Sequence, residues 1–258
     1  MFKYFEINAR GSNIRCKAYY KERTAENTVI YCTGFAGHKD NKAAEAFSEK
    51  LLSKVSNVVV LVFNWPAHGD DVKKKLNLEN CDNYLDLVIQ DVRSRFGAER
   101  IYSYSASFGG YLVLKYISEH GNPFQKVAIR CPAVYMYDVL SRAIMNADDF
   151  DGISKGKEVQ VGFDRKIIVT STFLEELKTN DIRQRDFLKY AEDILILHGT
   201  SDEIVPFDSG RDFAEKNLIE FIPMEKADHR FQNPAHMSLA NKYVMQFFDF
   251  QSFIHAEK

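Results

Sequence analysis

The sequence predicts an α/β fold: a mostly parallel central sheet with helices on both faces and a small inserted cap. Short apolar runs rich in β-branched residues alternate with segments whose apolar residues recur at helical spacing. The run Val58–Phe63 has no polar alternation, which is typical of a strand buried on both faces of a parallel sheet. The alternation is interrupted over residues 133–190 and then resumes.

Before the interruption the predicted elements follow in a regular order. Two strands come first, joined by a turn at Gly11-Ser12-Asn13. The pattern then becomes strand, helix, strand, helix. Strands are predicted over residues 2–8, 14–21, 28–33, 57–64, 100–104 and 126–131, and helices over 43–55, 85–96 and 111–117.

After the interruption, strands are predicted over 193–197 and 218–224, and helices over 208–216 and 234–253. Residues 133–190 carry aromatic and aliphatic side chains without clean alternation, with a hairpin near residues 162–164. Open α/β sheets bind ligands outside the carboxyl ends of their strands, so an insertion there is interpreted as a cap over a site. We therefore expect one core domain formed by residues 1–132 and 191–258, and a cap or lid insertion at 133–190.

Composition limits the classes of partner. With 45% hydrophobic residues the chain can bury a core, and its net charge of −2 comes from mixed acidic and basic residues. That pattern gives no basic footprint for nucleic acid and no polybasic membrane segment. A small neutral or weakly charged molecule is the expected partner. The oligomeric state stays open, a homodimer included.

The cysteines indicate the compartment. Cys16, Cys32, Cys81 and Cys131 are far apart and form no C-x-x-C pair, so reduced core thiols are expected rather than disulfides or a metal site. The N-terminal residues lack the pattern of a signal peptide, and no apolar run is long enough to span a bilayer. A cytoplasmic location is the resulting expectation.

A short motif follows the strand predicted over 100–104. The sequence IYSYSASFGG resembles the G-x-S-x-G nucleophile elbow, with Ser107 at its centre and Ser105 in place of the first glycine. Small residues are needed two positions before and after the serine, because the turning chains pass close together. Ser107 is the candidate nucleophile; Ser103 and Ser105 lack a glycine two positions later. The alternative is an ordinary strand-to-helix turn without chemistry.

Two later residues complete a possible triad. A serine hydroxyl needs a base to take its proton, and the base needs an orienting carboxylate. Asp202 lies in the loop after the strand in LILHGTSDEIVP, and His229 lies in the loop after the next strand, in IEFIPMEKADHRF. Both loops lie at carboxyl ends of predicted strands, at the edge expected for Ser107. We expect Ser107, Asp202 and His229 to act together in catalysis.

Other acidic and histidine residues fit this role less well. Asp202 itself could merely cap a turn. Asp193 precedes its strand and so belongs to the opposite edge, Asp208 is expected to cap a helix, and His236 follows the helix start Asn233-Pro234. Three further histidines near strand ends are expected to hold loops by hydrogen bonds: His38, His68 and His198.

Four segments together resemble the α/β-hydrolase superfamily: TGFAGHKD, FNWPAHGD, SASFGG, and HGTSDEIVP followed by ADHRF. They cover nearly the whole chain outside residues 133–190. Within the superfamily the sequence is most similar to small bacterial carboxylesterases, including the cinnamoyl (feruloyl) esterase group, and to related serine-peptidase-like hydrolases. The resemblance implies the α/β-hydrolase fold and a serine esterase activity.

The resemblance also implies an oxyanion hole. By position, the backbone N–H groups of Phe35 and Phe108 would stabilise the negative oxygen of the tetrahedral intermediate. One departure is Thr33, where relatives commonly have a histidine that braces this loop. The implied reaction is acyl transfer through an acyl-enzyme on Ser107, and it needs no metal and no organic cofactor.

The composition of the insertion suggests the substrate. Its aromatic and aliphatic side chains suit a hydrophobic acyl or aryl group, and Tyr135, Met136 and Phe163 are the expected pocket residues. A cinnamoyl or feruloyl-type ester is therefore a hypothesis. The alternative is that these side chains form the small core of the insertion itself.

Two other functions remain open. An amide or peptide hydrolase resembling aminopeptidases would use the same triad and would need acidic residues for the substrate amine, for which Asp148, Asp149 and Asp151 are candidates. A non-catalytic binding protein on this fold is the second.

Overall fold

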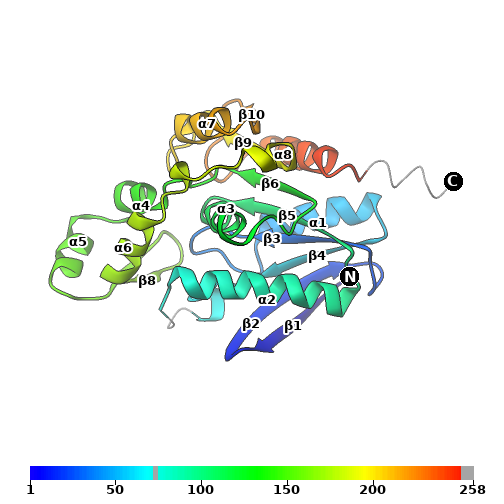
Figure 1. Cartoon of the computed structure of the whole chain (residues 1–258), viewed down its shortest axis with the longest axis horizontal. Helices are drawn as coiled ribbons and strands as arrows, with labels where there is room; N and C mark the ends of the chain where they lie inside the picture. The colour runs from blue at the N-terminus through cyan, green and yellow to red at the C-terminus, as the bar shows by residue number, and fades with distance from the viewer. Residues whose placement is uncertain (72–74, 251–258) are drawn as a thin grey trace.

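The computed structural model describes residues 1–71 and 75–250, and its eight-stranded sheet has the order β1-β2-β4-β3-β5-β6-β9-β10 (Figure 1). The strands are β1 (Phe2–Ala9), β2 (Ser12–Tyr20), β3 (Asn27–Cys32), β4 (Val58–Phe63), β5 (Arg100–Ala106), β6 (Lys126–Arg130), β9 (Ile194–Gly199) and β10 (Glu220–Met224). β2 is antiparallel to both β1 and β4, and the pairs from β4 to β10 are parallel. The predicted mostly parallel sheet is confirmed.

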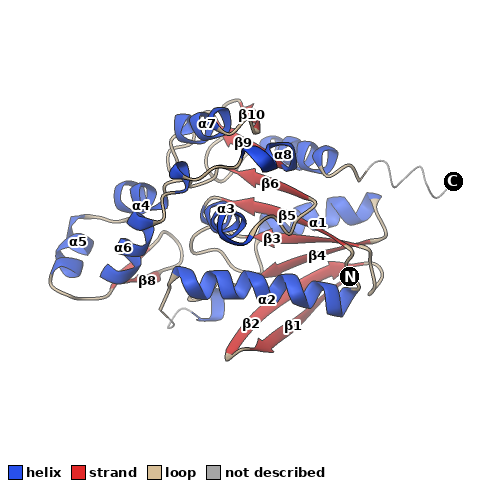
Figure 2. Cartoon of the chain, in the orientation of Figure 1, coloured by secondary structure: helices blue, strands red, loops and turns tan. Residues whose placement is uncertain are grey.

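Helices cover both faces of this sheet (Figure 2). The helices of the core are α1 (Lys42–Lys54), α2 (Leu78–Phe96), α3 (Phe108–His120), α7 (Phe207–Lys216) and α8 (Pro234–Phe247), with a short 3-10 helix η1 (Gly69–Asp71). Apolar side chains of α2, α3 and α7 pack on one face, and those of α1 and α8 pack on the other. Neighbouring residues of β3 alternate between these cores: Val29 and Tyr31 face α1, while Ile30 faces α2 and α3.

The segment between β6 and β9 lies beside one end of the large sheet, at the left of Figure 1. It contains α4 (Met136–Val139), η2 (Leu140–Ile144), α5 (Ala147–Ser154), β7 (Val159–Val161), β8 (Ile167–Val169), α6 (Ser171–Thr179), η3 (Ile182–Gln184) and η4 (Leu188–Asp193). β7 and β8 form the antiparallel hairpin predicted around residues 162–164. That this segment acts as a cap over bound substrate stays a prediction.

Several predicted boundaries were wrong. α2 begins at Leu78 rather than at 85, because Asn77 caps it through a bond from the Asn80 N–H and the buried Cys81 extends its apolar face. The N-cap of α7 is Pro206, not Asp208. α8 ends at Phe247, and residues 251–253 of the helix predicted there lie outside the described residues.

Two further expectations concern thiols and membranes. The cysteines are all free and buried, as predicted for core thiols. Among the described residues, no helix has the length and apolar character needed to cross a bilayer.

Candidate active site

Ser107 occupies a strained turn between β5 and α3. Its backbone has φ 51° and ψ −118°, a region that non-glycine residues rarely adopt. The turn is fixed by neighbours: the Ser107 N–H donates to the Arg130 carbonyl at 2.9 Å, and the Tyr111 N–H donates to the Ser107 carbonyl at 3.0 Å. Strain of this kind costs about 1–3 kcal/mol and is held only where the surroundings enforce it, as at a nucleophile elbow.

Gly109 explains why the motif needs a small residue after the serine. A Cβ at Gly109 would lie 2.4 Å from the Cys32 carbonyl oxygen and 2.6 Å from that of Thr33. Both contacts are with backbone of the neighbouring strand and loop, which have little freedom to move.

Gly109→Ala is therefore expected to destabilise the protein by about 3 kcal/mol, at the upper end for overpacking. Gly152→Ala, in α5, is the control with a smaller expected loss, because a Cβ there approaches only the partly exposed Val159 side chain, at 2.9 Å. Urea unfolding of both variants measures the difference. Equal midpoints for Gly109→Ala and the wild type would contradict the close approach.

Asp202 and His229 meet at the carboxyl ends of β9 and β10. His229 Nδ1 lies 2.8 Å from Asp202 Oδ2. The other carboxylate oxygen, Oδ1, accepts the backbone N–H groups of Ile204 at 2.9 Å and Val205 at 2.8 Å. The side chain of Asp202 is fully buried and that of His229 is 12% exposed, so the histidine alone of this pair reaches solvent.

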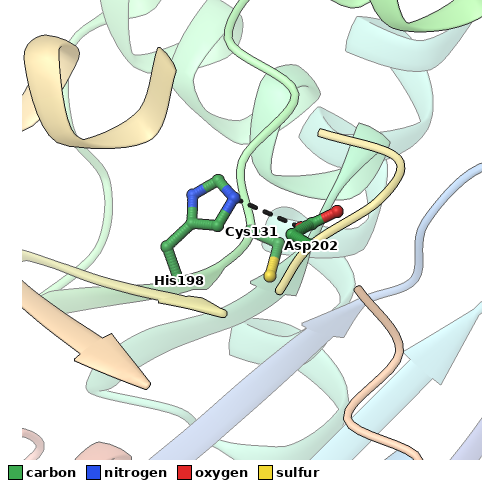
Figure 3. Close-up of side chains that lie close together, drawn as sticks. All are labelled: Cys131, His198 and Asp202. Carbon is green, nitrogen blue, oxygen red and sulfur yellow. Dashed lines mark ion pairs between the residues drawn. The ribbon is translucent and has the colours of Figure 1, made fainter. Parts of the chain in front are cut away.

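A second histidine supports the same carboxylate. His198 Nε2 lies 3.2 Å from Asp202 Oδ2 and 3.1 Å from the Val205 carbonyl oxygen. Figure 3 shows this nitrogen pointing at Asp202, with Cys131 beside the carboxylate. Because both neighbours of Nε2 are acceptors, this nitrogen must carry the hydrogen.

These bonds decide the charge of Asp202. Burial alone would raise the pKa of Asp202, but hydrogen bonds from His198 and His229 outweigh it and hold the pKa well below its usual range. Asp202 is therefore ionised at neutral pH. An ionised carboxylate only accepts, so His229 donates its Nδ1 hydrogen and leaves Nε2 free to accept a proton.

Ser107 and His229 line one cavity of about 630 Å³. The cavity is bounded by residues 33–38 after β3, the start of α1, the Ser107 turn, the β7–β8 hairpin and the loop at 229–230. Among the described residues, no hydrogen bond joins the Ser107 hydroxyl to the His229 ring. The structure thus brings Asp202 and His229 into contact, and it places Ser107 on the same cavity without a direct bond.

Phe35 and Phe108, the residues expected to form an oxyanion hole, both lie in backbone segments beside Ser107. A Cβ added at Gly34 would lie 3.3 Å from the Ser107 Cβ, so the loop carrying Phe35 passes directly beside the serine. Phe108 is the first residue of α3, where a backbone N–H has no acceptor within the helix. The two rings pack edge to face with centroids 5.7 Å apart. Their packing fixes the two backbone segments relative to each other.

The loop that begins at Thr33 is braced from the end of β4. Trp65 Nε1 donates to the Thr33 carbonyl at 3.0 Å, and the Lys39 N–H donates to Asn64 Oδ1 at 2.7 Å. The fully buried Trp65 and the buried Asn64 follow β4, so that strand's end supports the loop.

One of the three expected pocket residues lines this cavity and the other two do not. Phe163 lines the cavity, from the β7–β8 hairpin. Tyr135 and Met136 are not among the residues that line this cavity: Met136 is 1% exposed in the apolar core, and the Tyr135 ring lies 4.1 Å from the Arg183 guanidinium. Their part in a substrate pocket stays a prediction. The aromatic composition of the insertion could not tell which face of α4 would point inward.

Sequence reasoning missed two residues near the site. It took His198 as a loop support, and the structure adds its contact with Asp202. It did not single out Arg130, a buried arginine that lines the cavity. The signal in the sequence was that Arg130, a charged residue, directly follows the apolar residues Val127 to Ile129 of a predicted strand.

Two groups of side chains have the donor types of a metal site. In the first, Cys131, His198 and Asp202, the carboxylate already accepts from two histidines and two backbone N–H groups. In the second, two carboxylates beside His120 are bound by the ammonium of Lys115, Asp82 at 2.5 Å and Glu119 at 2.6 Å. Both groups are explained by hydrogen bonds and ion pairs.

Solved structures with a similar fold include esterases and a lipase. Est1E from Butyrivibrio proteoclasticus superimposes with a TM-score of 0.74 at 16% identity, covering 95% of this chain and 99% of that one. The same protein with ferulic acid bound gives 0.74 at 17%, covering 95% and 97%.

Two further structures show the same likeness. The esterase domain of a Rhodothermus marinus protein gives a TM-score of 0.68 at 17% identity, covering 95% of this chain and 96% of that one. A monoacylglycerol lipase from Paleococcus ferrophilus gives 0.64 at 19%, covering 91% and 97%. At such identities the likeness shows the α/β-hydrolase fold.

The sequence itself gives the family. A comparison with curated proteins yields no match. The model of the prolyl oligopeptidase family (Peptidase_S9) matches residues 64–252, a span that holds Ser107, Asp202 and His229. With that match over most of its length, the chain belongs to the prolyl oligopeptidase family of α/β-hydrolases.

Proposed function

We propose that the protein is a serine hydrolase that cleaves a carboxylic ester through an acyl-enzyme on Ser107. One observation carries the proposal: a serine held at φ 51° lines the same cavity as a histidine that is bonded to a buried carboxylate. Acyl transfer requires a positioned nucleophile, a base that reaches the substrate and a carboxylate that orients the base. Ser107 in its strained turn, the partly exposed ring of His229 and the buried Asp202 fit these three roles.

The proposed cycle uses these residues in order. His229 Nε2 takes the Ser107 proton as the hydroxyl oxygen attacks the acyl carbon, and Asp202 holds the imidazole in the required tautomer. The tetrahedral intermediate collapses, and His229 returns the proton to the leaving alcohol. Water, deprotonated by His229, then attacks the acyl-enzyme and releases the acid and Ser107. Each half of the cycle returns the histidine to its neutral form.

The N–H groups of Phe35 and Phe108 would stabilise the oxyanion in both halves. Donors fixed before the reaction act on charge that appears only in the transition state, and losing one costs roughly 3–4 kcal/mol. Because these donors are backbone groups, they depend on the packing that holds the backbone in place. Their support comes from the ring contact between Phe35 and Phe108 and from the loop brace at Trp65.

An ester fits the cavity better than a peptide with a free amine. The acidic residues considered for amine binding lie on α5 and are not among the cavity-lining residues: Asp149 caps that helix and Asp151 pairs with Lys155. The one acidic side chain that bounds the cavity near the hairpin, Asp164, is 3.2 Å from Arg230. The family name keeps amide hydrolysis as the second candidate.

The apolar part of the cavity supports a hydrophobic acyl or aryl group. Phe35, Ile144, Phe163 and Ile204 line it. Est1E, a structural neighbour, has been solved with ferulic acid bound. A cinnamoyl-type ester is therefore the substrate class that we propose first.

Initial rates on matched substrates test this function. We expect the purified protein to hydrolyse methyl ferulate and 4-nitrophenyl butyrate, and to hydrolyse aminoacyl 4-nitroanilides at least about tenfold more slowly in kcat/KM, a difference of roughly 1.4 kcal/mol. Faster cleavage of the anilides would favour the peptidase alternative. No turnover of any substrate by folded protein would favour a binding protein.

A further inference from the structure

The cavity around Ser107 is lined by more basic than acidic side chains. Its basic residues are Lys42, Arg130, Arg165 and Arg230, and Asp164 is the one acidic side chain that the described residues place on its wall. Because Asp164 pairs with Arg230 at 3.2 Å, three cations remain without a carboxylate partner among the described residues. This excess is local, since the whole chain has a net charge of −2.

Arg130 is the most unusual of the three. It ends β6, and it is 7% exposed. Its Nε–H has no hydrogen-bond partner in the described part of the chain, Nη1 contacts the weak acceptor Met237 Sδ at 2.9 Å, and the guanidinium lies 5.1 Å from the Phe231 ring. The carboxylate of Asp228 acts on it only at longer range, without an ion pair.

A buried guanidinium normally has a carboxylate beside it, because removing the charge from water costs several kcal/mol. Around Arg130 the described residues supply aromatic rings, the phenol oxygens of Tyr31 and Tyr104, a thioether and one distant carboxylate. The unpaired Nε–H and the position on the cavity wall indicate that the missing partner comes from a bound molecule.

The first turn of α1 adds to the positive potential of the same cavity. Asn41, Lys42 and Ala43 line the cavity, and the backbone N–H groups of a first turn have no acceptor within the helix. Asn41 Oδ1 accepts the Ala44 N–H at 3.0 Å. The N–H groups of this turn that can still donate to a ligand are those of Lys42 and Ala43. The acidic residue of this turn, Glu45, lies 3.6 Å from Lys17.

We propose that the cavity selects an ester that carries an anionic oxygen group, a carboxylate or a phosphate, and that Arg130 binds this group with help from Lys42 and the start of α1. The inference rests on the proposed ester hydrolysis and narrows its substrate class. The apolar wall at Ile144 and Phe163 would hold the hydrophobic part of the same molecule.

Paired substrates that differ only in charge test the proposal. On the acyl side, mono-4-nitrophenyl glutarate is compared with its methyl ester; on the alcohol side, 3-acetoxybenzoate is compared with its methyl ester. We expect the anionic member of at least one pair to have a roughly 10- to 100-fold higher kcat/KM, in keeping with a charge-assisted hydrogen bond. Glutarate and inorganic phosphate, as competitive inhibitors of the neutral ester, show which oxyanion is preferred.

Variants assign the preference to named residues. Arg130→Gln is expected to lower the ratio of anionic to neutral kcat/KM at least about tenfold, and Arg130→Lys to restore part of it. Lys42→Gln, at an exposed position, lowers the ratio by a smaller factor and serves if Arg130→Gln does not fold. Lys54→Gln, in the last turn of α1 and exposed, is the matched control with an unchanged ratio.

The outcomes separate this inference from the function on which it rests. Hydrolysis of the neutral esters with no preference for either anionic member overturns the inference alone. An anionic preference that survives in both Arg130→Gln and Lys42→Gln overturns the assigned site. Failure to hydrolyse any of the four esters overturns the proposed function.

Discussion

Replacing Ser107 by alanine is expected to lower kcat for ester hydrolysis by on the order of 10⁴- to 10⁶-fold, because the residues of a triad act as a unit and no other group can form the acyl-enzyme. The loss should appear without unfolding, since alanine is smaller and the turn is held by backbone bonds to Arg130 and Tyr111. Relief of the strain at φ 51° requires a glycine, so the turn geometry should persist.

Ser103→Ala is the matched control. Ser103 is a fully buried serine on β5 whose hydroxyl has no hydrogen-bond partner within residues 1–71 and 75–250, so its loss should leave the rate within about threefold of the wild type. Circular dichroism and thermal melting of both variants check the fold. Equal losses in the two variants would show that the strand, and not the hydroxyl at Ser107, was disturbed.

Asp202→Asn is expected to lower kcat by about 10⁴-fold, the size of effect seen when a triad carboxylate is replaced by its amide. The amide brings two hydrogens into a position that already faces four donors: the two histidines and the Ile204 and Val205 N–H groups. At least one pair of donors would then face each other, and His229 would turn or change its tautomer.

The matched control is Asp208→Asn, an exposed side chain in the first turn of α7 that pairs with Arg211 at 2.8 Å. Its rate should stay within about twofold of the wild type, since surface ion pairs contribute about 0–1 kcal/mol. The rates of both variants and the wild type are compared as kcat on a neutral ester from pH 6 to 9. An Asp202→Asn enzyme that kept more than a tenth of the rate would contradict the role of the carboxylate.

The fold and the candidate triad could be read from the sequence because both depend on local order along the chain. Val58–Phe63 is apolar at every position, which only a doubly covered strand requires. Asp202 and His229 follow β9 and β10 directly, and parallel strands bring their carboxyl ends to one edge. The glycine at 109 marks the close approach that the turn needs.

The pocket could not be read in the same way. Which side of α4 faces inward depends on packing between distant segments, so the sequence could not decide whether Tyr135 and Met136 would line the cavity around Ser107. Arg130 depends on the same distant packing, since it contacts Met237, 107 positions away in the sequence. The role of His198 comes from contacts across a loop, with Asp202 and Val205, which periodicity and spacing do not contain.

The most direct measurement treats the protein with a fluorophosphonate and maps the modified peptide by mass spectrometry. The reagent bonds to a serine hydroxyl that a neighbouring base has activated, so one adduct should form, on Ser107, and the His229→Ala variant should form it far more slowly. Folded wild-type protein that gains no adduct, or gains it on a different serine, would contradict the nucleophile on which the rest of the mechanism is built.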